Sequence, residues 1–181
     1  MLADLQRVLL DEATIADRVR SLGEQISADL ADSEADGGIT IVPILTGSLI
    51  FVADLVRHLQ QRLRLDLVTV SSYPGRSVAS RGAQIDGAIP EDLAGKHVLV
   101  VDDILDSGGT LSLVQRVIGA RRPKSLRTCV LLRKPKPSAV DVHCDYVGFD
   151  IPDVFVVGYG LDYDGYYRNL PCVGVLREDL V

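Results

Sequence analysis

The sequence predicts an α/β fold whose sheet is mostly parallel and flanked by helices, and the order of its elements carries that prediction. A strand, a helix and a second strand follow one another over residues 39–73. Such a unit implies parallel strands, because parallel neighbours need a crossover connection that is usually a helix. The alternation continues with a strand at 97–102, a helix at 110–121 and a strand at 126–132. With 181 residues, the chain is long enough for one domain with a full hydrophobic core.

The first half of the chain begins with a helix that we expect within residues 11–32. Its apolar positions recur every three or four residues, as one face of a helix requires: Ile15, Val19, Leu22, Ile26 and Leu30. Two glycines break this pattern, and the run ITIVPIL at 39–45 predicts a buried strand. The stretch LIFVADLVRHLQQRL at 49–63 predicts the next helix, and LDLVTVSSY at 65–73 predicts the second strand.

The second half opens with a segment of different composition. Residues 74–96, PGRSVASRGAQIDGAIPEDLAGK, are rich in Gly, Ser, Pro and Arg and predict a mobile lid or binding loop. Pro123 ends the helix that begins near residue 110, because proline cannot continue a helix. The last strands are short and are expected near residues 145–149, 154–159 and 172–176.

Composition and charge exclude several classes of protein. The net charge of −6 and the pI near 5.0 argue against a broad nucleic-acid-binding face. No apolar run approaches the roughly 18 residues of a membrane span. The N-terminal stretch MLADLQRVLLDE is too acidic for a secretory signal, and the three cysteines lack paired spacing, so they are expected to be core residues. We therefore expect a cytoplasmic protein that binds neither nucleic acid nor a membrane.

The stretch VLVVDDILDSGGTL, residues 98–111, carries the strongest functional signal. Its apolar start predicts a strand, so the polar residues that follow lie at the carboxyl end of that strand, where open α/β sheets bind ligands. Glycines in DSGGT let the backbone approach a ligand closely, and the first amides of the next helix point at it unpaired. The helix dipole and the hydroxyls of Ser107 and Thr110 complete what we interpret as a phosphate cradle.

Three carboxylates, Asp102, Asp103 and Asp106, stand beside this cradle and would repel a phosphate that they touched. A sugar between them removes the conflict, because its hydroxyls pair with carboxylates while its phosphate occupies the loop. The pattern therefore predicts a ribose phosphate site, with Mg²⁺ as a partner for a polyphosphate ligand. The alternatives are a capped turn with exposed carboxylates and a receiver domain with a VVDD strand; a Walker loop and a GxGxxG fingerprint are both absent.

The fourteen-residue stretch resembles the phosphoribosyl pyrophosphate binding motif of the type I phosphoribosyltransferases. Further stretches resemble the hypoxanthine-guanine branch of that family, in the same order: LTGSLIFVADLVRHL, VSSY, VGFDIPDVFVVGYGLDYDGYYRNLP and VGVL. The resemblance runs from about residue 8 to 176. It implies one domain over 1–181, with a small hood lobe over the base site that is built from the N-terminal segment and about 150–181. It also implies a homodimer or homotetramer.

The resemblance implies a reaction in which a purine base and phosphoribosyl pyrophosphate give a nucleoside monophosphate and pyrophosphate, with Mg²⁺. The aspartate that matches Asp106 is the family's proposed general base at the purine imidazole nitrogen. Asp102 and Asp103 match the acidic pair that holds the ribose hydroxyls. The loop that holds the 5′-phosphate is matched by Asp106, Ser107, Gly108, Gly109 and Thr110.

The remaining matches surround the purine and the pyrophosphate. Contacts to the base are implied for Lys134 at an exocyclic oxygen, Phe155 by stacking, Val156 through its backbone, and Asp162. Pyrophosphate contacts are implied for Thr46, Gly47 and Arg168. Implied metal ligands are Asp102, Asp103 and Asp162, and the start of the lid is matched by Ser72 and Tyr73.

The chain departs from the family pattern at two of these positions. Asp102 stands where the family usually carries Glu, which shortens the reach to the hydroxyl and keeps the charge. Thr46 stands where many members carry a basic residue, which removes one positive partner of pyrophosphate. A strained or cis peptide at Thr46-Gly47 would suit the glycine there.

Two alternatives to a purine transferase stay open at this point. One is a phosphoribosyl-binding regulator that has lost catalysis and binds nucleic acid through a basic face. The other is a phosphoribosyltransferase for another base, such as xanthine or a pyrimidine. The sequence does not distinguish hypoxanthine from guanine, because those bases differ by one exocyclic group.

Overall fold

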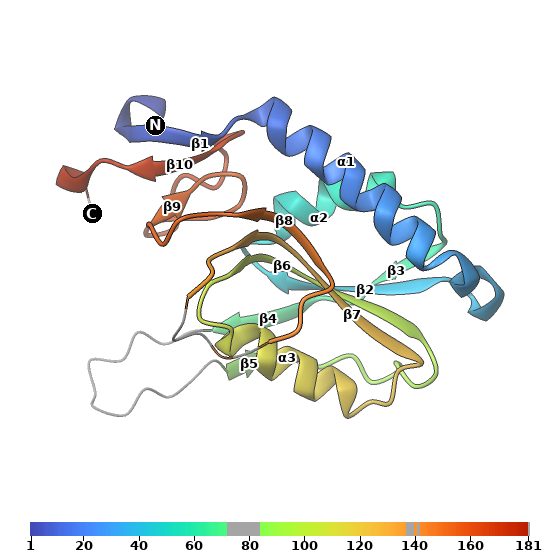
Figure 1. Cartoon of the computed structure of the whole chain (residues 1–181). Coiled ribbons are helices and arrows are strands. Elements are labelled where there is room, and N and C mark those ends of the chain that lie inside the picture. The colour runs from blue at the N-terminus through green and yellow to red at the C-terminus, as the bar shows by residue number, and fades with distance from the viewer. Residues whose placement is uncertain (72–83, 137–139, 141, 181) are drawn as a thin grey trace.

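The computed structural model describes residues 1–71, 84–136, 140 and 142–180. Within these residues, the central sheet has seven strands: β2 (Ile39–Leu45), β3 (Leu63–Leu65), β4 (Val68–Ser71), β5 (Gln84–Asp86), β6 (His97–Leu105), β7 (Ser125–Arg133) and β8 (Tyr146–Asp150). They run in the order β5-β4-β2-β6-β7-β8, with β3 paired to β2 beside this path. Each neighbouring pair is parallel except β4 with β5, which confirms the predicted mostly parallel sheet (Figure 1).

Helices cover both faces of this sheet. In Figure 1, α1 (Glu12–Asp29) and α2 (Leu49–Leu55) lie on one side, and α3 (Gly109–Gly119) lies on the other. Alternate residues of β6 serve the two layers: Leu99 and Val101 belong to the cluster with α1 and α2, whereas Val98 and Val100 belong to the cluster with α3. Burial on both faces explains why the central strands are continuous apolar runs in the sequence.

The helix predicted over 49–63 is shorter in the structure. After α2 ends at Leu55, one 3₁₀ turn, Val56–His58, leads the chain toward β3. The Gln61 side-chain amide donates to the Ser27 carbonyl on α1 at 2.8 Å. This contact and the pairing of β3 with β2 outweigh the local preference for helix, because tertiary packing routinely overrides propensity.

A second, antiparallel sheet joins the two ends of the chain. Its strands are β1 (Leu5–Leu10), β10 (Val173–Leu176) and β9 (Val156–Val157), in the order β1-β10-β9. The termini accordingly lie side by side in Figure 1. The strand β1 was not predicted, because it lacks a partner nearby in the sequence. The single-domain division and the role of this sheet as a hood stay predictions.

Part of the predicted lid lies outside the described residues. Ser72, Tyr73 and residues 74–83 belong to that part. The described remainder of the segment includes β5, which pairs with β4 through Ile85 and Val70.

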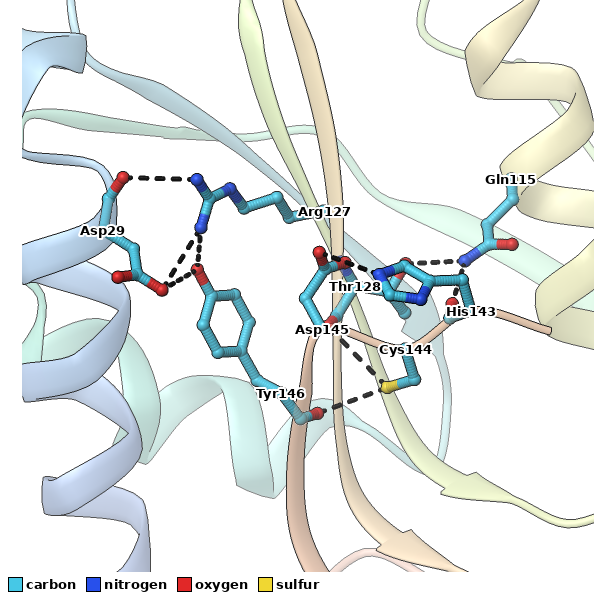
Figure 2. A network of polar contacts seen from close by, with 8 residues as sticks. All are labelled: Asp29, Gln115, Arg127, Thr128, His143, Cys144, Asp145 and Tyr146. Carbon is cyan, nitrogen blue, oxygen red and sulfur yellow. Dashed lines mark hydrogen bonds and ion pairs between the residues drawn. The ribbon is translucent and has the colours of Figure 1, made fainter.

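A network of polar contacts ties the edge of the sheet to helices on both faces (Figure 2). The Arg127 guanidinium donates to Asp29 Oδ2 on α1 at 3.2 Å and to the Tyr146 hydroxyl on β8. The Tyr146 hydroxyl in turn donates to the same Asp29 oxygen at 3.0 Å. On the other face, the Gln115 amide of α3 donates to Thr128 Oγ1 at 2.8 Å. Burial raises the pKa of Tyr146 to about 12, so its hydroxyl stays protonated as this network requires.

The variant Tyr146→Phe tests how much this network stabilises the edge of the sheet. Removal of the hydroxyl leaves Arg127 and Asp29 without their shared partner, and we expect unfolding free energy to fall by about 0.5–1.5 kcal/mol. Urea unfolding measures the change. His143→Gln is the matched control, since the His143 side chain is exposed and its contact among the described residues is a long one to Asp145 at 3.3 Å. This variant should stay within about 0.5 kcal/mol of wild type. Equal losses in both variants would contradict the prediction.

Candidate active site

A cavity of about 320 Å³ lies at the carboxyl ends of β2 and β6. Ten of the residues that the sequence singled out line it: Thr46, Gly47, Asp102, Asp103, Asp106, Ser107, Gly108, Thr110, Asp162 and Arg168. They come from three separate segments. Two of these meet because the adjacent parallel strands β2 and β6 end at the same edge of the sheet, and the third follows β9.

The loop between β6 and α3 forms the floor of the cavity. Gly108 precedes the helix with a φ of 81°, a left-handed conformation that favours glycine. A methyl carbon at this position would also lie 2.8 Å from the carbonyl oxygen of Val140. α3 therefore begins at Gly109 with its first amides unpaired within the helix, beside the hydroxyls of Ser107 and Thr110. An anion is the natural ligand of such a turn.

Asp102, which is buried, and Asp103, which is partly buried, form a carboxylate pair beside this loop. The Asp103 amide donates to Asp102 Oδ1 at 3.0 Å, and the Ile104 amide donates to Asp103 Oδ1 at 2.7 Å. Burial raises the pKa of Asp102, and the neighbouring charge of Asp103 raises it further. Burial likewise raises the pKa of Asp103. Both carboxylates destabilise the folded state when they are ionised. Their presence therefore indicates a ligand whose hydroxyl groups they bind, or a cation that they bind.

Two glycines allow three segments to meet beside Asp103. A methyl carbon on Gly47 would overlap Oδ2 of Asp103, and a methyl carbon on Gly160 would overlap the carbonyl oxygen of Gly47. Gly160 has a φ of 104°, so its conformation also favours glycine. The cis peptide bond of this loop joins Leu45 and Thr46, one bond before the position considered in the sequence.

Asp162 and Arg168 close the cavity from the segment that follows β9. They form an ion pair, with Arg168 Nη2 2.8 Å from Asp162 Oδ1. The other guanidinium nitrogen of Arg168 donates to the Gly160 carbonyl at 2.6 Å, and the Gly165 amide donates to Asp162 Oδ2 at 2.8 Å. These contacts fix a cationic group in the lining of a cavity whose other charged side chains are carboxylates.

Asp106 carries a charge that is balanced by two lysines. Its Oδ2 lies 3.1 Å from Lys134 Nζ, and its Oδ1 lies 2.6 Å from Lys136 Nζ. Partial burial raises the pKa of Asp106, but the hydrogen bonds from Lys136 and Lys134 outweigh it, and the pKa lies below its ordinary value. The sequence did not single out Lys136 as a partner of Asp106.

The family follows from this geometry together with one comparison. The chain matches the phosphoribosyl transferase domain family over residues 6–164. It belongs to that family. The loop that resembled a phosphoribosyl pyrophosphate motif is thus the cavity floor of a phosphoribosyl transferase domain.

Individual relatives cover nearly the whole chain. It is 47% identical over 167 residues to the hypoxanthine phosphoribosyltransferase of Salmonella typhimurium, a match that covers 92% of this chain and 93% of the relative. It is 38% identical over 174 residues to the hypoxanthine-guanine phosphoribosyltransferase of Bacillus subtilis, with 96% and 94% covered. The crystal structure of a hypoxanthine phosphoribosyltransferase from Staphylococcus aureus matches with a TM-score of 0.91 at 38% identity, over 99% of this chain and 96% of that one.

Four predicted site residues of this phosphoribosyltransferase lie outside the lining of the cavity. Gly109 starts α3, and Lys134 reaches the site through Asp106 although only 7% of its side chain is exposed. Phe155 is 47% exposed and contacts Tyr163 edge to face, with 5.6 Å between ring centroids. Val156 is buried in β9. The purine contacts implied for these residues stay predictions.

The three implied metal ligands do not form a protein-only metal site. Among the residues that the structure describes, no group of three or more His, Cys, Asp or Glu side chains could hold a metal ion. Asp162 instead pairs with Arg168 and accepts a hydrogen bond from the Gly165 amide.

No helix in the part of the chain that the structure describes is long and apolar enough to cross a membrane.

The variant Asp102→Asn tests whether the ionised carboxylate of Asp102 destabilises the folded protein. A carboxyl whose pKa is raised by folding destabilises the folded state wherever it is ionised, and this loss vanishes once the pH falls below its ordinary pKa. We expect Asp102→Asn to raise Tm at pH 7 by about 2–4 °C, which corresponds to about 1 kcal/mol for a chain of this size. The gap to wild type should close as the pH is lowered.

Calorimetry between pH 7 and pH 4 measures this gap. Asp17→Asn is the control, because Asp17 is exposed on α1 and should change stability by less than about 0.5 kcal/mol. A Tm that falls in Asp102→Asn at neutral pH would show that the carboxylate stabilises the fold.

Proposed function

We propose that this phosphoribosyltransferase transfers the phosphoribosyl group of phosphoribosyl pyrophosphate to hypoxanthine or guanine and releases pyrophosphate. The observation that carries the proposal is the cavity in which a phosphate cradle, the carboxylate pair of Asp102 and Asp103, and Asp106 occur together. Relatives that carry those bases in their names support the choice of substrate. The reaction belongs to purine salvage.

The sugar phosphate fits the inner part of the cavity. The 5′-phosphate accepts hydrogen bonds from the amides at the start of α3 and from Ser107 and Thr110. Asp102 and Asp103 accept hydrogen bonds from the ribose hydroxyls, which replace the water that burial has removed. This places the anomeric carbon between the carboxylate pair and the outer part of the cavity.

The purine fits the outer part, near Asp106 and Lys134. Asp106 takes the proton from the imidazole nitrogen while the base attacks the sugar, and its lowered pKa keeps it ionised and ready at neutral pH. Lys134 donates to the exocyclic oxygen of the base. Phe155 exposes an aromatic face on which the purine stacks, a contact worth about 1–3 kcal/mol.

The leaving pyrophosphate fits the side of the cavity formed by Thr46, Gly47 and Arg168. Arg168 stabilises the charge that develops as the bond to the sugar breaks. The oxygen-only donor set of Asp102 and Asp103 suits Mg²⁺, which is typically held by one or two carboxylates together with substrate phosphates. When bound, Mg²⁺ supplies further charge stabilisation to the departing group.

The regulator and the enzyme for another base are weaker alternatives. A regulator would need a basic face for nucleic acid, whereas this chain has a net charge of −6. Asp106 and Lys134 also lie together, as proton transfer and recognition of an oxo-purine require. We further propose that the enzyme is cytoplasmic and forms a homodimer or homotetramer.

Initial rates with phosphoribosyl pyrophosphate and each of four bases test the function. Hypoxanthine or guanine should give the monophosphate in a Mg²⁺-dependent reaction, and adenine should not. Turnover only with xanthine would replace the proposed substrate. No turnover with any base, combined with retention of RNA on a filter at low salt, would support the regulator.

A further inference from the structure

Four charged side chains form a closed cluster beside the cavity. Lys136 Nζ lies 2.6 Å from Asp106 Oδ1 and 2.7 Å from Asp153 Oδ1. Lys134 Nζ lies 3.1 Å from Asp106 Oδ2 and 3.8 Å from Asp153 Oδ1. The members follow three adjacent strands, β6, β7 and β8, so they gather where the purine is proposed to bind.

The cluster occupies both oxygens of the proposed general base. A carboxylate that takes a proton needs one oxygen facing the donor, and that oxygen must be free of its lysine. Under the proposed function, the purine supplies its exocyclic oxygen to Lys134, so Lys134 can leave Asp106 Oδ2 as the purine arrives. Lys136 has a second anion, Asp153, that holds it in place throughout.

We propose that Lys136 is a positioning residue for Asp106: anchored on Asp153, it holds Oδ1 of Asp106 so that Oδ2 faces the purine. This inference rests on the proposed function. In the step itself, the purine nitrogen–hydrogen bond breaks and an oxygen–hydrogen bond forms at Asp106 Oδ2. The other imidazole nitrogen of the purine bonds to the anomeric carbon while the carbon–oxygen bond to pyrophosphate breaks, and pyrophosphate leaves with that electron pair. Both lysines keep their protons.

The charges around Asp106 make the role of Lys136 specific. The segment after β7 contributes Lys134 and Lys136, and the segment after β8 contributes Asp153. On β6, the strand that leads to Asp106, the carboxylate pair of Asp102 and Asp103 supplies negative charge. Across the cavity, Arg168 is paired with Asp162. Among the residues that the structure describes, Lys134 and Lys136 are the cations in contact with Asp106. Under the proposed function, Lys136 keeps this contact once the base binds.

The experiment compares three substitutions in the full chain. Lys136→Met removes the charge at similar length, Lys136→Arg keeps it, and Asp153→Asn removes only the anchor. Lys96→Met is the matched control, because Lys96 makes an equally short contact of 2.6 Å with Asp92 at the opposite edge of the sheet. Rates are measured against pH, and ¹³C NMR follows the titration of the Asp106 carboxyl without substrate.

The expected result is a change in kcat and in its pH dependence. Lys136→Met should move the acidic limb of the kcat profile to higher pH and lower kcat on that limb about 2- to 5-fold, the range for a partly exposed ion pair. Lys136→Arg should restore the profile, and Asp153→Asn should fall between. In the NMR titration, the pKa of Asp106 should rise in Lys136→Met and not in Lys96→Met.

Different failures have different signatures. A raised KM with an unchanged pH profile would make Lys136 a substrate contact and overturn the positioning role. An unchanged Asp106 titration in Lys136→Met would overturn the ion pair itself, whether or not the protein is active. A wild-type protein that makes no monophosphate from any base would reject the proposed function, while the NMR result would still decide the ion pair.

Discussion

The Asp106→Asn variant is expected to lose about 10²–10⁴ in turnover rate and to bind phosphoribosyl pyrophosphate as tightly as wild type. The side chain keeps its size, so the cavity and the amides that start α3 stay in place. What disappears is the group that takes the purine proton. Because the loss falls in the chemical step, kcat should drop while the affinity for the sugar phosphate is preserved.

Single-turnover rates at saturating substrate isolate that step from product release. The substitution also leaves Lys134 and Lys136 without an anion, so a control must disturb the same lysines and keep the base. Asp153→Asn does this, because Asp153 contacts both lysines. If Asp106→Asn turned over as fast as Asp153→Asn, the three carboxylates would be sugar and metal ligands only.

The parallel sheet and the place of the site could be predicted because both depend on local patterns. The central residues of β6 and β7 are buried on both faces and therefore appear as short apolar runs, at 98–101 and 129–132. The polar residues that follow β6 must then lie at the carboxyl edge of the sheet. The glycine turn before α3 is also local, since φ at Gly108 requires that residue type.

Features that depend on distant contacts could not be predicted in the same way. The early end of α2 follows from contacts with α1 and β2, which the stretch 49–63 does not reveal. β1 exists because β10 pairs with it from the other end of the chain. In both cases, a partner more than twenty residues away in the sequence decides the conformation.

The charged cluster around Asp106 could not be predicted from the sequence for the same reason. Lys134 alone resembles a solvated loop residue, yet it is buried against Asp106. Lys136 could have been suspected only because it lies two residues after Lys134 in RKPKP. Asp153 lies in the IPD stretch, to which the resemblance assigns no role. Their meeting depends on the ends of three adjacent strands, so a linear pattern does not show it.

Gly47→Ala is expected to lower kcat/KM about 10²-fold, although the added methyl group carries no charge and removes no ligand. The new carbon would overlap Oδ2 of Asp103 and would lie 2.7 Å from Cγ of the same carboxyl group. Gly160 packs closely on the carbonyl oxygen of Gly47, so the loop has little room to move. The Asp103 carboxylate must therefore turn away from the sugar. A displacement of about 1 Å at a reacting group lowers the reaction rate by about 10²-fold.

Steady-state kinetics with varied phosphoribosyl pyrophosphate measure the loss, and circular dichroism checks that the variant folds. Gly119→Ala is the matched control, because the nearest atom to its new methyl carbon is Leu126 Cδ2 at 3.9 Å. At the end of α3, alanine suits a helix better than glycine does, so the control should be as active as wild type and no less stable. A folded Gly47→Ala protein with wild-type kcat/KM would mean that the orientation of Asp103 does not limit the reaction. The carboxylate pair would then act through Asp102 alone, and the close approach of the three segments would serve packing rather than catalysis.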